Sequence, residues 1–438
     1  MGAAVKVVGG EWSNWSGGVH CKPKAIVAPK DEVELAAAIR GAQGPVRVPG
    51  SGHSFTPICA SDGTMIDLDA FRGLKRIDTQ TVMATLGAAT KLWQIGPILH
   101  AAGFGFKNMG DIDRQALAGV VNTGTHGTGP NLGNFSSEVA GFRLVMANGD
   151  VVNCTPSENT ELFEAGRCSL GMLGVMSEIT MKVRPAYKLK EQNYLKAPDE
   201  LFAELDHLIN SNRHFEFFWF PYSDRCICKA LNETDDPAPA PRTSEEMYAR
   251  GEKSGGETRL FEGINEILPY APFLLKFAHG LFSQFMPGPA KVRWSHEIFP
   301  SPRTTRFNEM EYAVPAEKGP DCIREIVEMI RKRRINTGFP IEYRTVAGDD
   351  VWMSPFQGRA SATIAVHQYF RVDTRKLFDA CETIFKSYEG RPHWGKRHTL
   401  DATRAEQVYP QFGRFRELRR KVDTKGTFLN PHLRAIFA

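Results

Sequence analysis

The feature that most constrains this chain is a glycine-rich turn at residues 49–55, Pro-Gly-Ser-Gly-His-Ser-Phe, which directly follows a short apolar strand. Gly50 and Gly52 lack the Cβ atoms that would keep a ligand away from the backbone. Successive N–H groups in such a turn form a concave site for an anion, and the two serines add hydroxyl groups. The turn therefore predicts a phosphate site with the imidazole of His53 beside it.

Length and composition place the chain among ordinary globular proteins with more than one domain. Its 438 residues exceed one typical core, and 42% hydrophobic residues with a net charge of +4 give no sign of nucleic-acid binding. Residues 1–18 lack the layout of a secretion signal, and no apolar run is long enough to span a membrane. We therefore expect a cytoplasmic protein, with a surface contact to a membrane left open at the most apolar stretch, residues 269–286.

The eight cysteines are scattered along the chain, without the dense spacing of a disulfide scaffold. Cys226 and Cys228 share one face of a predicted strand, but no second Cys or His pair lies close by in sequence to complete a zinc site. We therefore expect reduced thiols and no bound metal.

The first half of the chain alternates short strands with helices. Asn148-Gly149, between two apolar runs, is the strongest short hairpin signal in the sequence. The hydrophobic patterns predict helices at 31–42 and 92–102 and strands at 46–48, 65–68 and 173–183. We place a domain boundary near Arg184 and Pro185.

The second half pairs long strands with amphipathic helices, which are predicted at 199–210, 321–334 and 374–388. Such helices cover one face of an antiparallel sheet, which makes the predicted fold class α+β. Residues 235–257 are rich in Pro, Ala, Glu and Gly and predict a mobile loop or insertion.

A charged strand face lies in this second half. Side chains two apart in a strand share a face, so Glu342 and Arg344 point the same way while their neighbours point the other. A structural ion pair on an exposed sheet face explains that pattern equally well. If the strand at 362–369 pairs with this one, His367 lies beside both residues. A carboxylate, a guanidinium and an imidazole together suit proton abstraction and the stabilisation of an anion.

Two further loops place polar groups next to glycines. In residues 393–396, His-Trp-Gly-Lys, the glycine allows close backbone approach and Lys396 offers a cation, although a solvated lysine fits the composition as well. Residues 123–129, Thr-Gly-Thr-His-Gly-Thr-Gly, suit a second phosphate contact, while His126 is equally a satisfied turn histidine. The first turn lacks the third glycine of the Rossmann spacing, and no glycine loop ends in the Lys-Ser/Thr pair of a P-loop, which argues against both nucleotide classes.

Taken in order, four motifs resemble those of the vanillyl-alcohol-oxidase superfamily, and most closely its branch of sugar-1,4-lactone oxidases and alditol oxidases. The motifs are the turn at 50–55, the loop at 123–129, the strand at 342–344 and the loop at 393–396. The resemblance spans roughly Trp12 to Leu433, and four ordered motifs are specific where any one of them is weak.

This resemblance implies a two-lobed, PCMH-type FAD-binding domain at residues 12–184. It also implies a substrate domain at 185–396, with an antiparallel sheet covered by helices, and a C-terminal segment at 397–438 that returns to the FAD site. The implied cofactor is FAD, attached covalently through His53. The other implied FAD contacts are Pro49, Gly50, Ser51, Gly52, Ser54, Phe55, Gly110, Asp111, Gly119, Thr123, Gly124, Thr125, His126, Gly127, Gly174, Ile179 and Asn430.

By the same resemblance, the chemistry is hydride transfer from a carbinol carbon to flavin N5. Glu342 and Arg344 are implied to bind the reacting sugar hydroxyls, with Lys396 near the flavin. Being cationic, Arg344 and Lys396 suit the negative charge that flavin reduction leaves. His367 is our candidate proton acceptor with Glu342 orienting the hydroxyl, and the reverse assignment stays open.

Asp111 departs from the pattern of the resemblance, because many relatives, including alditol oxidases, carry serine there. An acidic residue resembles bacterial lactone-oxidising relatives more than polyol oxidases. Gly110 occupies a position where a small residue opens a path for oxygen, which favours an oxidase that forms hydrogen peroxide and an ascorbate-type product. The expected substrate is L-gulono-, L-galactono- or D-arabinono-1,4-lactone. The alternatives are a lactone dehydrogenase that uses a cytochrome or quinone, and an alditol oxidase.

Overall fold

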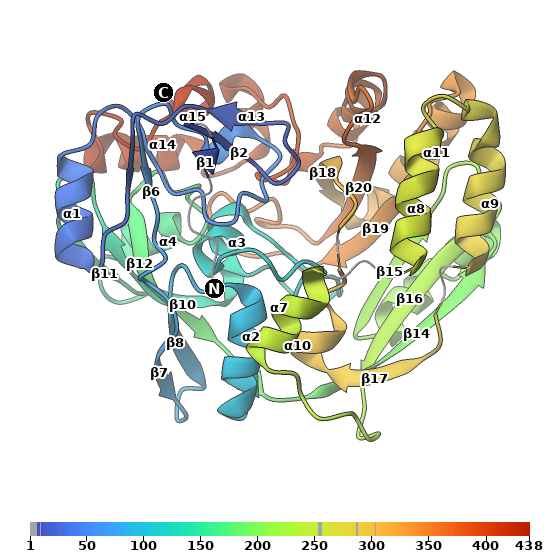
Figure 1. The fold of residues 1–438 in the computed structure, drawn as a ribbon, viewed down its shortest axis with the longest axis horizontal. Coiled ribbons are helices and arrows are strands. Elements are labelled where there is room, and N and C mark those ends of the chain that lie inside the picture. Colours follow the sequence, from blue (N-terminus) through green and yellow to red (C-terminus); the bar gives the residue numbers. More distant parts are fainter. Residues whose placement is uncertain (1–6, 9, 253–255, 286–287, 303) are drawn as a thin grey trace.

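The computed structural model describes residues 7–8, 10–252, 256–285, 288–302 and 304–438. Helices and strands alternate along the chain and assemble into two halves, each built on its own antiparallel sheet, which confirms the predicted α+β class. Figure 1 shows the N-terminal elements and the C-terminal helices on one side and the large sheet of the second half on the other.

The first half contains a small parallel sheet and a larger antiparallel one. The parallel sheet has the order β4 (Ala25–Val27), β6 (Thr64–Ile66), β5 (Val46–Arg47). The antiparallel sheet has the order β11 (Val151–Cys154), β10 (Val139–Val145), β12 (Val175–Lys182), β8 (Met83–Gly87), β7 (Leu74–Asp78). The predicted hairpin is confirmed, because Val145 pairs with Val151 across Asn148-Gly149.

Helices cover both sheets of this half. Asp31 begins α1 (Glu32–Arg40) by accepting a hydrogen bond from the Glu34 N–H, the usual way in which an aspartate caps a helix. The other helices are α2 (Leu92–Ala101), α3 (Leu117–Thr123) and α4 (Thr160–Gly166). Short elements complete the half: β1 (Val7–Val8), β2 (Glu11–Ser13), β3 (His20–Cys21), β9 (Phe104–Gly105), β13 (Arg184–Pro185) and 3₁₀ turns at Pro57–Cys59 and Ser136–Glu138.

The second half is built on an eight-stranded antiparallel sheet. Its order is β17 (Lys291–Trp294), β14 (Lys188–Lys196), β16 (Cys226–Glu233), β15 (His214–Trp219), β19 (Ile341–Val346), β20 (Ser361–Tyr369), β18 (Phe307–Pro315), β21 (Arg391–Pro392). One face is apolar and packs under four helices: α5 (Pro198–Ala203), α6 (Leu205–Ser211), α11 (Gly319–Arg333) and α12 (Arg375–Ser387). On that face Phe217 and Tyr343 stack with ring centroids 4.8 Å apart. The opposite face is free to carry polar groups.

The remaining helices of this half are α7 (Ser244–Glu252), α8 (Gly256–Ile267), α9 (Leu275–Phe285) and α10 (Ser295–Ile298), with 3₁₀ turns at Pro272–Leu274 and Ala316–Lys318. The predicted loop at 235–257 is wrong for residues 244–252, which form α7, and for residues 256–257, which begin α8. Met247 is buried, and the Tyr248 ring lies 5.2 Å from that of Trp93, so packing on α2 overrides the loop-like composition. Residues 253–255 lie outside the described part of the chain.

The helix predicted at 199–210 is two helices, because Glu204 takes a non-helical backbone conformation between α5 and α6. Leu201, Leu205 and Leu208 from the two helices pack on the apolar face of the sheet, where all three are buried. The other predicted helices are confirmed to within two residues at each end. All eight cysteines are free thiols, as predicted.

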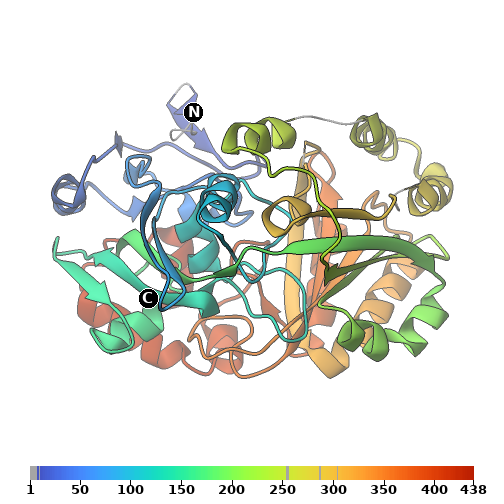
Figure 2. The ribbon, with the colours of Figure 1, turned by 90° about the horizontal axis from the view of Figure 1, so that it is seen from below.

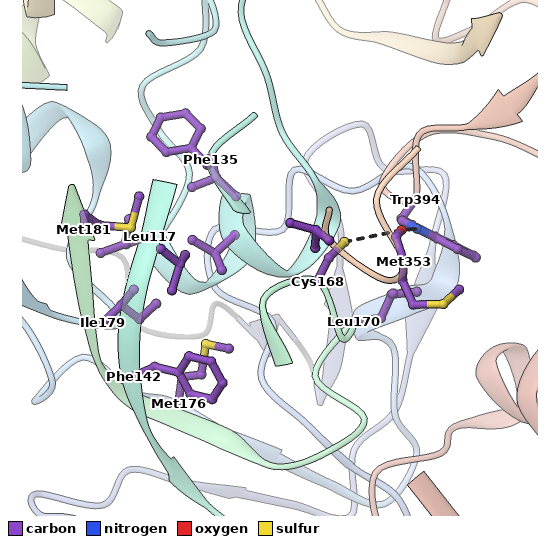
Figure 3. Packing of buried hydrophobic residues seen from close by; sticks show 14 of the residues in the cluster. Leu117, Phe135, Phe142, Cys168, Leu170, Met176, Ile179, Met181, Met353 and Trp394 are labelled. Atoms are coloured by element: carbon purple, nitrogen blue, oxygen red, sulfur yellow. Dashed lines mark hydrogen bonds between the residues drawn. The ribbon is translucent and has the colours of Figure 1, made fainter. Parts of the chain in front are cut away.

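The C-terminal part of the chain returns to the first half. The helices α13 (Ala402–Val408), α14 (Phe412–Val422) and α15 (Pro431–Phe437) lie beneath the N-terminal half in Figure 2 and contribute to its core. Two residues from outside these helices, Met353 and Trp394, join the same core, where Figure 3 shows them beside Cys168. The Trp394 indole N–H donates to the Met353 carbonyl at 2.7 Å. Segments distant in sequence thus hold the two halves together.

Candidate active site

A large cavity lies between the polar face of the eight-stranded sheet and the loops of the first half. It encloses about 1760 Å³ of empty space, part of it open to solvent. Most of the predicted site residues line it: Pro49, Gly50, Ser51, Gly52, His53, Ser54, Phe55, Gly110, Asp111, Gly119, Thr123, Thr125, His126, Gly174, Glu342, Arg344, His367 and Lys396. The fold therefore brings together motifs that are up to about 350 positions apart in the sequence.

Four predicted contact residues do not line this cavity. Gly124 ends α3 in the left-handed conformation, and Gly127 packs so closely that a Cβ there would lie 2.3 Å from the Met109 carbonyl oxygen. Ile179 is fully buried in β12. Asn430 caps α15 through the Leu433 N–H, and its amide donates to carbonyls of the turn at 57–60. These four residues pack against their neighbours in the fold instead of facing the cavity.

The glycine-rich turn leaves β5 in a conformation that glycine alone adopts without strain, with φ of 53° at Gly50 and 68° at Gly52. Among the N–H groups of residues 50–54, that of Gly52 alone donates to another described residue, the Pro49 carbonyl at 2.9 Å. The residues that carry the other N–H groups line the cavity, and these N–H groups have no partner in the described part of the chain, which suits an anion site. The Ser51 hydroxyl has a structural role, since it donates to the Arg114 carbonyl at 2.6 Å.

His53 stacks on Trp15, with ring centroids 5.5 Å apart and an angle of 27° between the planes. Burial is the main cause that lowers its pKa to about 4, and the nearby charges of Lys396 and Lys91 lower it further. The imidazole is therefore neutral at pH 7. A neutral ring nitrogen carries the lone pair that a nucleophile needs.

Arg47 holds this side of the cavity together, and sequence reasoning missed it. Its guanidinium is buried and donates to four carbonyls, those of Ile58 (2.8 Å), Leu170 (2.5 Å), Gly171 (3.2 Å) and Phe428 (2.9 Å). These carbonyls belong to three separate segments of the cavity wall. No local pattern marks such a residue, because all its partners except Ile58 are more than 100 positions away.

The cavity fits FAD at both of its ends. Behind the anion site, the wall is apolar, with the buried side chains of Ile66, Leu68, Val175 and Phe428 from one hydrophobic cluster. A Cβ at Gly119 would meet no atom within 4 Å, so the wall leaves room there. A slot of this kind suits an adenine, the turn suits a pyrophosphate, and the polar sheet face suits a reacting ring.

Three carboxylates surround Arg344 on the polar sheet face. Its Nε donates to Glu216 of β15 at 2.7 Å and its Nη2 to Asp111 at 2.8 Å, while Nη2 also contacts Glu342. Burial by itself would lower the pKa of this guanidinium, yet the three carboxylates raise it well above its usual value. Arg344 thus stays charged in a buried place. The predicted pairing of Glu342 with Arg344 is an interior feature of the site rather than an exposed surface pair.

Glu309 of β18 organises the neighbouring part of the face. It contacts the Lys396 ammonium, and His367 Nε2 lies 3.5 Å from its carboxylate. Burial raises the pKa of the Glu309 carboxyl, but Lys396 and His367 more than offset this and hold it at about 2. The same pairing raises the pKa of Lys396, against the opposing effect of burial. Lys396 is therefore a charged, half-buried residue that is paired with a carboxylate, and not a solvated one.

The strand register decides where His367 lies. β19 and β20 pair as predicted, with Glu342 opposite Ala365 and Arg344 opposite Thr363. His367 is on the same face but one pair further along, so its partner is Glu309 on the other neighbouring strand. Its Nδ1 lies 3.4 Å from the Pro340 carbonyl. The imidazole thus flanks the Glu342–Arg344 pair without touching it in these contacts.

His126 is a partner of the sheet rather than an isolated turn residue. Its Nε2 lies 2.7 Å from Glu311 and its Nδ1 lies 2.8 Å from the Gly127 carbonyl, with both side chains buried. Burial raises the pKa of Glu311, but His126 is the main cause that brings it well below its usual value. This contact joins the second glycine loop to β18.

Sequence reasoning missed Glu216, Glu309 and Glu311, although a signal was present. Residues 307–312, Phe-Asn-Glu-Met-Glu-Tyr, and residues 214–217, His-Phe-Glu-Phe, alternate polar with apolar side chains in the manner of the 341–346 strand. Applying the same period-two argument to all long strands of this half finds every carboxylate of the polar face.

Residues 23–155 match the family model of an FAD binding domain, in agreement with the cavity that the fold provides for this cofactor. The protein is therefore a flavoprotein, an FAD-linked oxidoreductase that acts on CH–OH groups. Residues 179–436 match the family model described as D-arabinono-1,4-lactone oxidase. The chain belongs to this D-arabinono-1,4-lactone oxidase family, which confirms the resemblance found in its motifs.

Several curated proteins are similar over almost their whole length. The L-gulono-1,4-lactone dehydrogenase of Mycobacterium tuberculosis is 36% identical over 97% of this chain and 98% of its own. The L-gulonolactone oxidase of Bos taurus is 30% identical over 98% of both. An alditol oxidase from a Streptomyces species is 28% identical over 96% of this chain and 98% of its own.

Among solved structures, a cholesterol oxidase from B. sterolicum superposes with a TM-score of 0.79, at 14% sequence identity over 98% of this chain and 97% of that chain. A likeness at this identity concerns the fold alone, and it shows that the two proteins share their fold. Among the helices that the structure describes, none combines the length and the apolar character needed to cross a bilayer.

Proposed function

We propose that this protein oxidises a sugar-1,4-lactone. One observation carries the proposal: an anion-binding turn and a charged sheet face confront each other across a single cavity that fits FAD. When bound, FAD supplies the acceptor for a hydride from the carbinol carbon of the substrate. Relatives of 36% and 30% identity are named for the oxidation of L-gulono-1,4-lactone and L-gulonolactone, which supports a lactone as the substrate.

The polar sheet face binds the substrate hydroxyls in this proposal. Glu342 accepts a hydrogen bond from a neighbouring hydroxyl of the sugar, and Arg344 donates to the oxygen of the reacting hydroxyl through Nη1, which donates to none of the described residues. The contacts to Glu216 and Asp111 fix the guanidinium plane, so that little conformational freedom is lost on binding.

His367 accepts the hydroxyl proton. With the Nδ1 hydrogen directed to the Pro340 carbonyl, the lone pair of Nε2 lies on the side of Glu309. Protonation then creates an imidazolium next to a carboxylate, which stabilises it. Lys396 is the cation that balances the negative charge left after hydride transfer. It contacts one carboxylate directly, whereas three carboxylates already offset the charge of Arg344.

Substrate reduction of the flavin tests these assignments. An anaerobic panel of L-gulono-, L-galactono- and D-arabinono-1,4-lactone with one alditol is added, and bleaching of the flavin band is followed. At least one lactone is expected to bleach it faster than the alditol, and no bleaching by any lactone refutes the proposal. His367→Gln is expected to slow flavin reduction by the lactone at least about 100-fold, the contribution of a general base. If Glu342→Gln slows reduction by this amount and His367→Gln does not, Glu342 is the proton acceptor.

The covalent attachment of FAD to His53 is a separate part of the proposal. The bond between an imidazole nitrogen and the flavin 8α carbon replaces one C–H bond of that methyl group and the imidazole N–H bond. The two hydrogens leave as protons, the electron pair would reduce the flavin ring itself, and oxygen would then reoxidise it. Burial supplies the neutral imidazole that this needs. Protein precipitated with acid is expected to stay yellow, and a His53→Ala variant is expected to lose the colour. His20→Ala, at an exposed histidine, is the matched control. Colourless precipitate from the unmutated protein refutes the attachment and leaves FAD binding intact.

Molecular oxygen is the proposed electron acceptor, which gives hydrogen peroxide as the second product. Gly110 lines the cavity and has no side chain, and the absence of a side chain there supports access of oxygen. The second candidate is transfer to a cytochrome or quinone carrier, since the 36% identical relative is named as a dehydrogenase. One equivalent of peroxide per lactone supports the oxidase. Rapid dye reduction without peroxide supports the dehydrogenase.

We also assign FAD binding to residues 12–184 and 397–438 and substrate binding to 185–396. The shared core of the N-terminal half and the C-terminal helices supports the first assignment. The polar face of β15, β18, β19 and β20 supports the second.

A further inference from the structure

We infer that Trp15 positions the imidazole of His53 for the covalent bond to the flavin. The inference rests on the proposed attachment, because it concerns the geometry that makes this bond possible. Trp15 belongs to none of the four sequence motifs, and only the fold brings it to His53. Its role follows from the contacts that hold the His53 ring.

Hydrogen bonds do not hold this ring. The ring nitrogens of His53 form no hydrogen bond with any described residue, and His53 lines the cavity. Three other histidines of the interior differ, because both ring nitrogens of His126 and of His279, and Nδ1 of His393, have hydrogen-bond partners. The ring nitrogens of His53 are thus available for a new bond, and packing sets the orientation of the ring.

Trp15 provides that packing. Its indole stacks on the imidazole, with ring centroids 5.5 Å apart and 27° between the planes. The indole is fixed in turn by edge-to-face contacts, at 6.4 Å with Phe55 of the same turn and at 5.2 Å with Phe307 of β18. Phe55 and Phe307 also stack on each other, 5.8 Å apart. The indole therefore lies between the His53 turn and the second half of the protein, where it limits the rotation of the imidazole.

Hydrogen bonds tie the same segment of the chain to the turn. The Trp15 N–H donates to the Gly52 carbonyl at 2.8 Å, and the Asn14 side-chain amide donates to the Ser54 carbonyl at 2.9 Å. These two carbonyls belong to the residues on either side of His53. Asn14 is itself buried, and its side chain makes two further hydrogen bonds within its own segment. Two consecutive residues thus hold the backbone on both sides of His53, while the indole holds the ring.

A fixed ring matters for this bond because the reacting atoms must approach in line at about 3 to 3.5 Å. In the attachment, an imidazole nitrogen bonds to the 8α carbon, the N–H hydrogen and one hydrogen of the methyl group leave as protons, and the electron pair passes to the flavin ring. Oxygen then takes up this pair. Trp15 exchanges no atom or electron in this step. It is a positioning residue, which removes in advance the rotational freedom that the imidazole loses on reaction.

The test follows the attachment in the full-length protein after its synthesis in cells has been stopped with an inhibitor of translation. Acid-stable flavin is measured by the fluorescence of the protein band after denaturing electrophoresis, and total bound flavin by the absorbance of the desalted protein. In Trp15→Leu, acid-stable flavin is expected to form at least about tenfold more slowly, because the reacting group loses its alignment. Total bound flavin is expected to stay within about twofold, because the backbone N–H at this position still donates to Gly52 and the turn keeps its shape.

Two further variants separate the positioning of the ring from a general loss of structure. Trp15→Phe keeps an aromatic face toward His53 and is expected to form acid-stable flavin at a rate within about threefold of that of the unmutated protein. Trp294→Leu is the matched control, because it removes a tryptophan that contacts another histidine, His100, with ring centroids 4.4 Å apart and away from the cavity. This control is expected to leave the rate unchanged.

Several outcomes overturn the inference. One is that Trp15→Leu forms acid-stable flavin as fast as Trp294→Leu does. Another is that Trp15→Phe is as slow as Trp15→Leu, or that total bound flavin in Trp15→Leu falls as far as acid-stable flavin does, because either result assigns Trp15 a structural role only. An unmutated protein that holds no acid-stable flavin refutes the attachment itself and the inference with it. Bleaching of the flavin by lactones, measured in parallel, reports separately on the oxidation of the substrate.

Discussion

Replacing Arg47 tests whether one buried side chain joins the three segments that form the cofactor end of the cavity. In Arg47→Met, four carbonyls lose the guanidinium that now satisfies them. A buried polar group left without a partner costs about 1 to 3 kcal/mol, so four such groups at the lower limit give about 4 kcal/mol. Removing a buried positive charge returns part of this, because burial already lowers the pKa of this arginine. We therefore expect a loss of about 2 to 4 kcal/mol.

The free energy of unfolding is measured by urea denaturation, with far-UV circular dichroism and flavin fluorescence as two probes whose transitions must coincide. The flavin content of the purified variant is measured alongside and is expected to fall, because Gly171 and Phe428 line the cavity. Arg76→Met, at an exposed position of β7, is the control and is expected to change stability by less than about 0.5 kcal/mol. If Arg47→Met matches this control in both stability and flavin content, the reasoning is refuted.

Three further outcomes follow from the site. In Glu309→Gln, Lys396 loses its bound carboxylate, so the pKa of Lys396 falls. The alkaline limb of the pH profile for flavin reduction is therefore expected to move to lower pH. A limb that does not move contradicts this pairing. In Gly110→Ala, the new methyl group meets the His126 carbonyl at 3.0 Å. Stopped-flow measurement is expected to show that the rate of flavin reoxidation by oxygen falls at least tenfold, and by more than the rate of flavin reduction. An equal effect on the two rates refutes a role of Gly110 in oxygen access. The protein is also expected to lose stability between pH 6.5 and 4, because buried histidines have folded-state pKa values below the unfolded value of 6.5. The unfolded chain then binds more protons in this window, so their contribution is complete above pH 6.5 and is lost as pH falls, by about 1 kcal/mol per histidine at pH 5.5. Histidines that contribute to this effect include His214, His279, His393 and His398, with pKa values of about 4, 4, 4 and 3. Denaturation midpoints measured as a function of pH report the loss of stability, and midpoints that do not change with pH contradict it.

Local patterns predicted most of the elements but not their limits or their partners. The hairpin at Asn148-Gly149 and the helices α1, α2, α11 and α12 follow from turn chemistry and periodicity, and the structure confirms them. The helix α7 was missed because its composition resembles a loop, and its stability comes from the docking of Met247 and Tyr248 rather than from its own sequence. The break at Glu204 was missed for the same reason, since packing against the sheet decides it.

In the candidate site, too, some features follow from the local sequence and others depend on contacts between distant segments. The sequence by itself determined which backbone positions need glycine, as at Gly50 and Gly52, and which side chains share a strand face, as Glu342 and Arg344 do, because both depend on the residue and its nearest neighbours. Tertiary structure alone decided that Arg344 meets Asp111 and Glu216, and that His367 meets Glu309 and not Glu342. Strand order and register between distant segments set those contacts, and the electric charge that a substrate experiences in the cavity depends on them.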